Sequence, residues 1–261
     1  MIRRTGPPLL LKLFLRIILL VPPGLCAQDL EPRPDIILPA YNHQAIVVSH
    51  TGFTLSYNEE WEQPEWVAYE LTREEVLGSV ARSGSFRADP RIPSGSAAVA
   101  HYVGTGYDRG HLVPAADQRW SRAAMRDSFY MSNVSPQTPG FNRGIWSSLE
   151  AAVRGFALAN GSVFVVTGPV LTHPPLEHIG PGRLPVPRLF YKVILDYTPP
   201  ELKGIGFLLP HEASSDPLSA FAVTIDSVEE LTGLDFYPGL PDHEESKLES
   251  QCEPLLWFGS F

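Results

Sequence analysis

Short apolar runs, separated by glycine, proline and polar turns, recur along most of the chain. In the first half three such runs predict strands of ordinary length. These strands cover residues 45–48, 53–57 and 66–71, with a hairpin-like turn at His50-Thr51-Gly52. In the second half the runs are nearly continuous, which is typical of central strands buried on both faces. They cover residues 163–167, 190–196, 204–209 and 221–225.

Helical signals are fewer and shorter. Thr72 with Glu75, and Ser227 with Glu230, have the spacing of a capping box, so each predicts a short helix. The second of these helices should end near Gly233. Further helices are predicted over 121–127 and 142–158, a strand end over 129–132, and loops over 83–99 and 136–140. The pattern indicates a mixed α+β domain with a central sheet.

Composition narrows the architecture. The chain has 261 residues and is 44% hydrophobic, which suits one sizeable domain. Its 26 prolines and 21 glycines argue against a long helical bundle. We expect a loose, proline-rich leader over 28–40 and one folded domain over 41–261.

The first 27 residues read as a targeting segment. They carry Arg3, Arg4, Lys12 and Arg16 and no acidic residue, and an apolar run follows. This arrangement predicts a cleaved secretory signal peptide over 1–27, and hence a secreted or periplasmic protein. A mitochondrial transit peptide is the alternative, although it should contain more serine. The charges interrupt the apolar run, so stable membrane insertion is not expected.

The charge balance argues at first against a nucleic-acid partner. The formal net charge is −9, and loss of the four basic residues of the targeting segment would make it more acidic. However, residues 108–154 contain six arginines against four acidic residues, a net charge of +2. A local basic surface can still bind a phosphate backbone. Cys252 would be the one cysteine left after loss of Cys26, so no intrachain disulfide is expected.

The stretch from Tyr107 to Arg154 concentrates the candidate chemistry. His111 ends a turn-like Asp-Arg-Gly-His run, and a histidine can accept a proton from water near neutral pH. Asn142, Trp146, Glu150 and Arg154 recur every four residues and would form one slowly winding stripe on a helix. Asn142 and Glu150 offer oxygen ligands suited to Mg²⁺, and no Cys/His cluster suggests zinc.

Each of these features has an ordinary alternative. A single histidine is most often a structural or surface residue. The stripe also fits a plain amphipathic helix with a Glu150–Arg154 surface ion pair. It is the combination of a base, hard-cation ligands and arginines that points to phosphodiester cleavage.

Several separated blocks resemble the DNA/RNA non-specific endonucleases, the endonuclease G-like ββα-metal (His-Me finger) nucleases. The resemblance rests on Tyr107–Asp117, Phe129–Gln137, Phe141–Trp146 and Leu149-Glu150, and extends over roughly residues 40–250. It implies an α+β fold with a central, mainly antiparallel sheet flanked by helices. It also implies cleavage of DNA and RNA to 5′-phosphate products without sequence specificity, and relatives of this kind are often homodimers.

The same resemblance assigns roles to residues of this chain. His111 would be the general base, Asn142 the direct ligand of Mg²⁺ (with Mn²⁺ as the alternative ion), and Glu150 a ligand acting through water. Arg109 and Arg154 would bind the scissile phosphate, and Asn133 would support the site and the substrate.

Two other classes of function remain open from the sequence. One is a catalytically inactive, secreted nucleic-acid-binding or interaction protein on the same fold. The other is a metal-independent ribonuclease that uses a pair of histidines.

Overall fold

A seven-stranded antiparallel sheet forms the centre of the computed structural model, which describes residues 38–41 and 44–259. The predicted targeting segment 1–27 and most of the leader 28–40 lie outside these residues. The strands, in their order across the sheet, are β1 (Ile46–His50), β2 (Phe53–Asn58), β3 (Gln63–Thr72), β6 (Ser162–Pro169), β9 (Leu189–Asp196), β10 (Lys203–Pro210) and β11 (Ala222–Val223). The predicted α+β class with a mainly antiparallel sheet is therefore confirmed.

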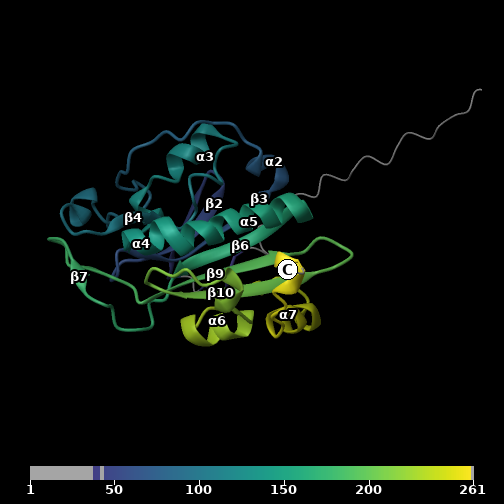
Figure 1. Cartoon of the computed structure of the whole chain (residues 1–261). Helices are drawn as coiled ribbons and strands as arrows, with labels where there is room; N and C mark the ends of the chain where they lie inside the picture. Colours follow the sequence, from purple (N-terminus) through teal and green to yellow (C-terminus); the bar gives the residue numbers. More distant parts are fainter. Residues whose placement is uncertain (1–37, 42–43, 260–261) are drawn as a thin grey trace, which may run out of the picture. The chain divides into compact units, whose positions relative to one another are not determined.

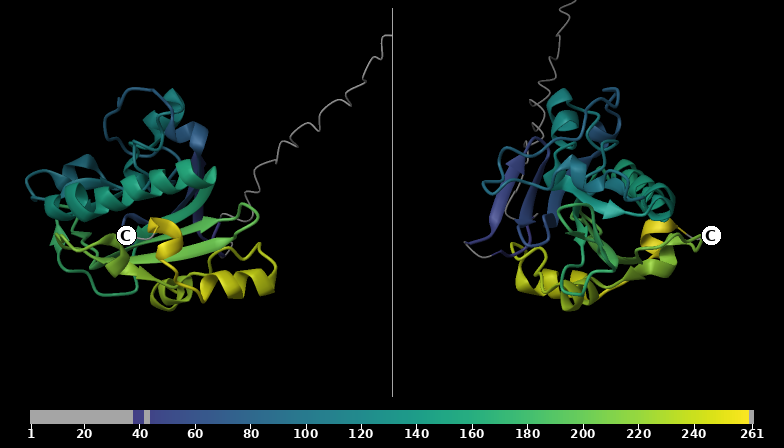
Figure 2. Two further views of the ribbon diagram at one scale, coloured as in Figure 1. Left: turned by 45° about the vertical axis from the view of Figure 1, so that its right-hand side comes forward. Right: turned by 90° about the vertical axis from the view of Figure 1, so that its left-hand side faces the viewer.

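Helices cover both faces of this sheet (Figures 1 and 2). The long helix α5 (Ser147–Asn160) packs on one face, and α6 (Ile225–Thr232) and α7 (Asp242–Glu249) pack on the other. Strand β9 shows the alternation most clearly: Phe190 and Ile194 enter the core under α5, whereas Tyr191 and Val193 enter the core under α6. The near-continuous apolar run predicted a strand buried on both faces, and β9 confirms it.

The last described helix lies on the α5 side of the sheet. Helix α8 (Leu255–Phe258) places Trp257 edge-on against Phe156 of α5, with ring centroids 4.9 Å apart. Cys252, just before α8, is a half-buried free thiol. Within the described residues, no helix is both long and apolar enough to cross a membrane.

One predicted helix start is confirmed and one is wrong. Thr72 caps α2 (Arg73–Val76) and forms the complete capping box with Glu75. The second helix begins earlier than its capping-box pattern suggests, because the Thr224 side chain accepts a hydrogen bond from the Ser227 backbone N–H. Strand β11 is short for the same reason, and Gly233 ends the helix in the left-handed conformation, as predicted.

A second layer lies against the α5 face and contains the stretch of interest. Strand β4 (Asp108–His111) pairs with β5 (Val134–Gln137), so the Asp-Arg-Gly-His run is a strand and the turn-like interpretation was wrong. The predicted strand over 129–132 was also wrong, since the 3₁₀ helix η2 (Met131–Asn133) stands there. Helix α3 (Arg122–Asp127), capped by Ser121, confirms the predicted short helix.

The chain then turns from β5 towards α5. Part of the predicted 136–140 loop belongs to β5, and α4 (Pro139–Phe141) and the π-helix η3 (Asn142–Trp146) lead into α5. The predicted 83–99 loop contains only an isolated bridge between Arg87 and Tyr130 and the first residue of η1. The remaining elements are η1 (Val99–Tyr102), β7 (His178–Ile179), β8 (Leu184–Pro185) and η4 (Leu218–Phe221).

Candidate active site

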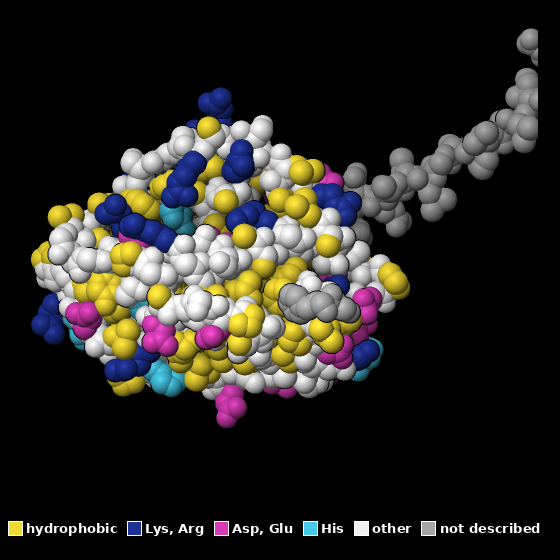
Figure 3. Space-filling view, viewed as in Figure 1, with side chains coloured by type: hydrophobic (Ala, Val, Ile, Leu, Met, Phe, Trp, Pro, Cys, Tyr) yellow, Lys and Arg dark blue, Asp and Glu magenta, His cyan; other side chains and the backbone are white. Residues whose placement is uncertain are grey.

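A cleft of about 490 Å³ opens between the β4–β5 pair and the N-terminal half of the η3–α5 helix. Its lining is basic and rich in ionisable groups: it includes four arginines, one histidine and two carboxylates. It is lined by Arg82, Phe86, Asp108, Arg109, His111, Pro114, Ala115, Ala116, Asn142, Arg143, Ser147, Glu150 and Arg154. Figure 3 shows basic side chains gathered on the upper part of this face, whereas acidic side chains lie mainly towards its lower part and edge.

His111 stands at the end of β4, opposite Val134 of β5. Its ring packs against Phe86 and edge-on against Phe129, each with centroids 5.0 Å apart. Burial lowers the pKa of His111 to about 3, and the nearby Arg82 adds to this effect. The imidazole is therefore neutral at physiological pH, and its Nε2 has no hydrogen-bond partner in the described part of the chain.

Asn142 is held by a carboxylate of the opposite wall. Its Nδ2 donates to Asp108 Oδ2 at 2.9 Å. Arg143 donates two further hydrogen bonds, of 2.8 and 2.7 Å, to the same carboxylate. Burial raises the pKa of Asp108, but the bonds from Arg143 and Asn142 outweigh it and leave that pKa below its ordinary value. Asp108 is thus a fixed anion, and it commits the amide nitrogen of Asn142, leaving Oδ1 as the atom able to bind a cation.

Arg154 is oriented by a buried chain of polar groups. Its Nη1 donates to Asp117 Oδ1 at 2.9 Å, and the Tyr69 hydroxyl donates to Asp117 Oδ2 at 2.9 Å. Asp117 is fully buried, and burial raises its pKa despite the opposing effect of Arg154. The alternative of a Glu150–Arg154 surface pair is wrong, because Arg154 pairs with Asp117 instead.

Glu150 lies close to a buried lysine, Lys192, in strand β9 of the sheet. Burial raises the pKa of Glu150, and Lys192 of β9 is the main group that lowers it again. Lys192 is fully buried, donates to Thr167 Oγ1 at 3.1 Å and lies 4.6 Å from the centroid of the Trp146 ring. Glu150 and Lys192 therefore favour each other's charged form inside the protein.

Arg109 and Arg82 flank the histidine through aromatic stacking. Arg109 lies 4.9 Å above the Phe86 ring, and Arg82 lies 5.2 Å above the Phe129 ring. Arg109 Nε is buried without a hydrogen-bond partner in the described part of the chain. Both guanidinium groups line the cleft, where a bound phosphate would supply acceptors.

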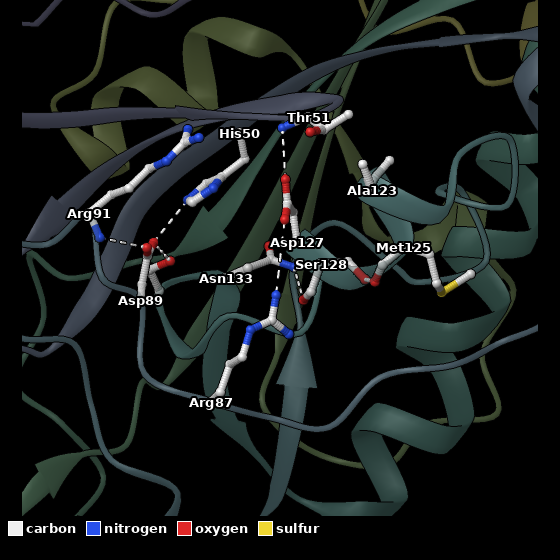
Figure 4. Close-up of polar contacts among 12 residues, drawn as sticks. His50, Thr51, Arg87, Asp89, Arg91, Ala123, Met125, Asp127, Ser128 and Asn133 are labelled. Atoms are coloured by element: carbon white, nitrogen blue, oxygen red, sulfur yellow. Dashed lines mark hydrogen bonds and ion pairs between the residues drawn. The ribbon is translucent and has the colours of Figure 1, made fainter.

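Asn133 does not line the cleft. It is fully buried, and all its hydrogen bonds go to the backbone: its Oδ1 accepts from Val113 N–H at 2.9 Å, and its Nδ2 donates to Val113 and Ser128 carbonyls. Asn133 thus fixes the segment that follows His111, which is a supporting position without access to a substrate in the cleft. Figure 4 shows Asn133 beside Ser128.

Two further contacts tie this layer to the β1–β2 hairpin (Figure 4). His50 is bonded to Asp89 at 2.8 Å, and the Thr51 N–H donates to Asp127 at the end of α3. His211, the residue after β10, accepts a hydrogen bond at Nε2 from the Thr138 N–H, just before α4, at 2.8 Å. These hydrogen bonds hold the layer that contains the cleft against the central sheet.

The predicted stripe on the helix is only partly correct. Asn142, Glu150 and Arg154 line the cleft, but Trp146 is fully buried, with its indole N–H donating to the His111 carbonyl at 3.3 Å. The reason is the π-helix at Asn142–Trp146, where Gly144 has non-helical backbone angles. The kink at Gly144 interrupts the four-residue spacing that a regular helix would keep.

Several residues of the site were not identified from the sequence. Asp108 and Asp117 belong to a motif but carry no signal of their own role, and Arg82 and Phe86 lie in or beside a segment with no distinguishing pattern. Lys192 did carry a signal: it is the one charged residue inside the apolar run before Asp196. A lysine in a strand buried on both faces requires a buried partner.

The cleft suits a hard divalent cation. Asn142 Oδ1 is uncommitted, and the Glu150 carboxylate lines the same wall. Oxygen ligands in small number, with room for water, are what Mg²⁺ selects. Asn142 and Glu150 are the residues that would hold such an ion.

A β4–β5 pair followed by a helix, with a neutral histidine and an asparagine facing one arginine-lined cleft, defines a nuclease-type site. The family model of the DNA/RNA non-specific endonucleases matches residues 37–243, and the chain belongs to this family of hydrolases that act on nucleic acids.

Individual relatives agree with this assignment. The chain is 34% identical to human mitochondrial endonuclease G over 206 residues, covering 74% of this chain and 69% of the relative. It is 33% identical to mouse mitochondrial nuclease EXOG over 209 residues, but the match spans only 56% of that protein. A nuclease of Syncephalastrum racemosum is 34% identical over 230 residues, covering 79% of this chain and 71% of the relative.

A solved structure supports the fold. EndoG in the EndoG/EndoGI complex superposes with a TM-score of 0.71 and 34% identity, covering 78% of this chain and 89% of that one.

Proposed function

We propose that this chain is a metal-dependent endonuclease that hydrolyses phosphodiester bonds of DNA and RNA without sequence recognition. The observation that carries the proposal is His111: a buried, neutral imidazole with an unpartnered Nε2, in a cleft that also contains Asn142, Glu150 and four arginines. Backbone-led binding suits this cleft, because guanidinium groups pair with phosphate and carry no sequence information.

In the proposed reaction, His111 accepts a proton from a water molecule as the water oxygen bonds to phosphorus. The bond from phosphorus to the 3′ oxygen breaks, giving a 5′-phosphate and a 3′-hydroxyl that has taken up a proton. The anionic phosphate in the cleft would raise the low pKa of His111 and so strengthen it as a base. Arg109 and Arg154 would bind the phosphate and offset its negative charge.

Asn142 would hold Mg²⁺ directly and Glu150 would hold it through water, with Mn²⁺ as the alternative ion. Such an ion would supply charge stabilisation at the phosphate and the leaving oxygen. Asp108 and Asp117 contribute as positioning residues, since they orient Asn142 and Arg154.

The direct test is digestion of plasmid DNA and of RNA, with Mg²⁺ and with EDTA. The wild type should degrade both only with Mg²⁺. His111→Ala should lose at least about a hundredfold in turnover, the lower end of a general base's contribution, while nucleic-acid binding is largely kept. His243→Ala, at an exposed histidine of α7, is the matched control.

The outcomes separate the three functional classes. Intact DNA and RNA in the presence of Mg²⁺, with binding retained, would favour the inactive binding protein. RNA cleavage in EDTA with inert DNA would favour the metal-independent ribonuclease. That class is disfavoured by the cleft, which contains a single histidine among the described residues.

Asn142→Ala tests the metal ligand. We expect the Mg²⁺ concentration for half-maximal activity to rise at least about tenfold, because the amide oxygen proposed to bind the ion is removed. Ser148→Ala, on the exposed side of the same helix, should leave the Mg²⁺ titration unchanged. An unaltered titration for Asn142→Ala would remove that residue from the metal site.

The compartment and the assembly state belong to the same proposal. Residues 1–27 support a cleaved targeting segment; the names of endonuclease G, EXOG and a yeast mitochondrial nuclease among the relatives favour the mitochondrial alternative over export. Sequencing the mature N-terminus and locating the protein in cell fractions would decide between them. A homodimer is proposed from the family resemblance, and light scattering of the purified protein tests it.

A further inference from the structure

A cluster of acidic side chains lies across α6, α7 and the loop between them, on the sheet face opposite to the cleft (Figure 1). The carboxylates form two groups, each with oxygen atoms within 4.8 Å of one another, and both groups include Glu249. Their members are Asp226, Glu229, Asp235, Glu245 and Glu249. The cluster therefore joins three segments of the chain through one central residue.

Glu249 differs from the acidic residues of an ordinary solvent-exposed surface. Its side chain makes no hydrogen bond in the described part of the chain, Oε1 is completely buried, and the residue is only 7% exposed. Buried polar atoms are nearly always paired, and a buried carboxylate without a partner is costly. Glu249 is also the last residue of α7, where the helix dipole is negative and disfavours a further negative charge.

The surroundings increase this cost. Burial raises the pKa of Glu249 to about 8, with further increases from Glu229, Glu245, Asp226 and Asp235. The same kind of effect raises the pKa values of Glu229 and Glu245. The group must be neutralised near physiological pH by either a proton or a cation.

The ligand set favours one kind of cation. Ca²⁺ takes about six to eight oxygen ligands, carboxylates among them, in a flexible arrangement. Each group offers three carboxylates whose oxygen atoms lie close enough to share one ion. Mg²⁺ is smaller, demands a stricter octahedron and seldom takes an all-protein cage.

We propose that Glu249 is the centre of a structural divalent-cation site of the Ca²⁺ type, separate from the catalytic cleft, which ties α7 to α6. The outer ligands, Asp226 and Asp235, are exposed and Glu249 is buried, so the cluster is open to solvent on its outer side and buried at its centre. The site does not depend on the activity proposed for the cleft.

The ion would stabilise the packing of α6 and α7 against the sheet. Leu248, next to Glu249, and Ile225 and Val228 of α6 are buried together against the sheet. A cation site formed by carboxylates of both helices exists only in the folded state, so the binding free energy of the ion adds to the stability of the fold.

Thermal unfolding of the whole protein tests the site, with the protein first treated with EGTA. Millimolar Ca²⁺ should raise the Tm of the wild type by about 5 °C or more. Glu249→Gln should lose most of this shift, and Glu230→Gln, an exposed acid of α6 outside the cluster, should keep it. Calorimetric titration with CaCl₂ should show binding in the wild type and in Glu230→Gln only.

Three results would overturn the proposal. The first is a wild-type Tm that Ca²⁺ does not change. The second is a Ca²⁺ shift that Glu249→Gln retains in full, since the ion would then bind elsewhere, for example in the cleft. The third is a Glu249→Gln variant that is more stable than wild type in EGTA and in saturating Ca²⁺, which would mean that Glu249 is simply protonated. If Glu249→Gln does not fold, Asp235→Asn at the exposed rim replaces it and must reduce the Ca²⁺ shift.

Discussion

At the scale of single residues, His111 combines strong burial with the position proposed for the general base. Its ring lies between two phenylalanines and near Arg82, so the positive form of the imidazole is disfavoured. A neutral base is available over the whole physiological pH range as a result. The same burial makes the fold sensitive to acid.

The stability of the protein should therefore fall as the pH falls below about 6.5. The unfolded His111 takes up a proton near its ordinary pKa, whereas the folded residue, with a pKa of about 3, does not. The unfolded state binds more protons between these values, so the contribution of His111 to stability is present above about 6.5 and is lost towards 3. From pH 6 to pH 5 this loss is about 1 kcal/mol.

Urea unfolding at the two pH values measures this effect. His111→Gln should lose about 1 kcal/mol less than the wild type over the same interval. His243→Gln, at an exposed position, should follow the wild type. Equal losses in His111→Gln and wild type would show that His111 is not kept neutral by the fold.

At the scale of secondary-structure elements, the approach of β4 to β5 sets the position of the histidine. Gly110 pairs with Ser135, and a methyl group added at Gly110 would overlap the buried side chain of Gln137. The glycine before His111 is therefore required for strand packing, in addition to any role in admitting a substrate.

Gly110→Ala and Gly155→Ala form a matched pair. Gly110→Ala should cost about 1–3 kcal/mol of stability, the range for overpacking, and should lower activity as His111 moves. Gly155 lies on the exposed side of α5 with open space around its Cα, so Gly155→Ala should stabilise the protein by about 0.5–1 kcal/mol. Chemical unfolding and nuclease assays on both variants check this, and a stable, fully active Gly110→Ala would contradict it.

The elements predicted correctly from the sequence are those whose signals are local. The strands β1, β2, β3, β6, β9 and β10, the Thr72 capping box and the Gly233 end of α6 all follow from hydrophobic period or cap chemistry. The turn predicted at β4 is wrong because Asp-Arg-Gly-His has the composition of a turn, and only its pairing with β5 makes it extended. The π-helix and the Asp117–Arg154 contact depend on tertiary packing, which has no signature in the spacing of residues.

At the scale of the whole molecule, an acidic protein carries a basic cleft, which is the proposed substrate-binding surface. The formal net charge is −9, yet four arginines line the cleft. Binding to a phosphate backbone through such contacts releases counterions and weakens steeply with salt. The number of arginines that contact phosphate sets the slope of log affinity against log salt concentration.

Arg82→Ala should reduce that slope. In a His111→Ala background that prevents cleavage, the slope of log affinity for duplex DNA against log salt should fall in magnitude by about 1. Lys247→Ala on α7, on the opposite face of the sheet, removes the same charge and should leave the slope unchanged. Fluorescence anisotropy over a salt series measures both, and identical slopes for the two variants would exclude Arg82 from the binding surface.

The basic cleft and the carboxylates of α6 and α7 lie on opposite faces of one sheet. Such a separation gives the molecule an electric dipole that passes through the sheet. In the field of a polyanion, the protein would turn its cleft forward before contact, so long-range forces select the productive orientation even though the total charge is repulsive. At low ionic strength, the same dipole would favour head-to-tail attraction between copies of the protein.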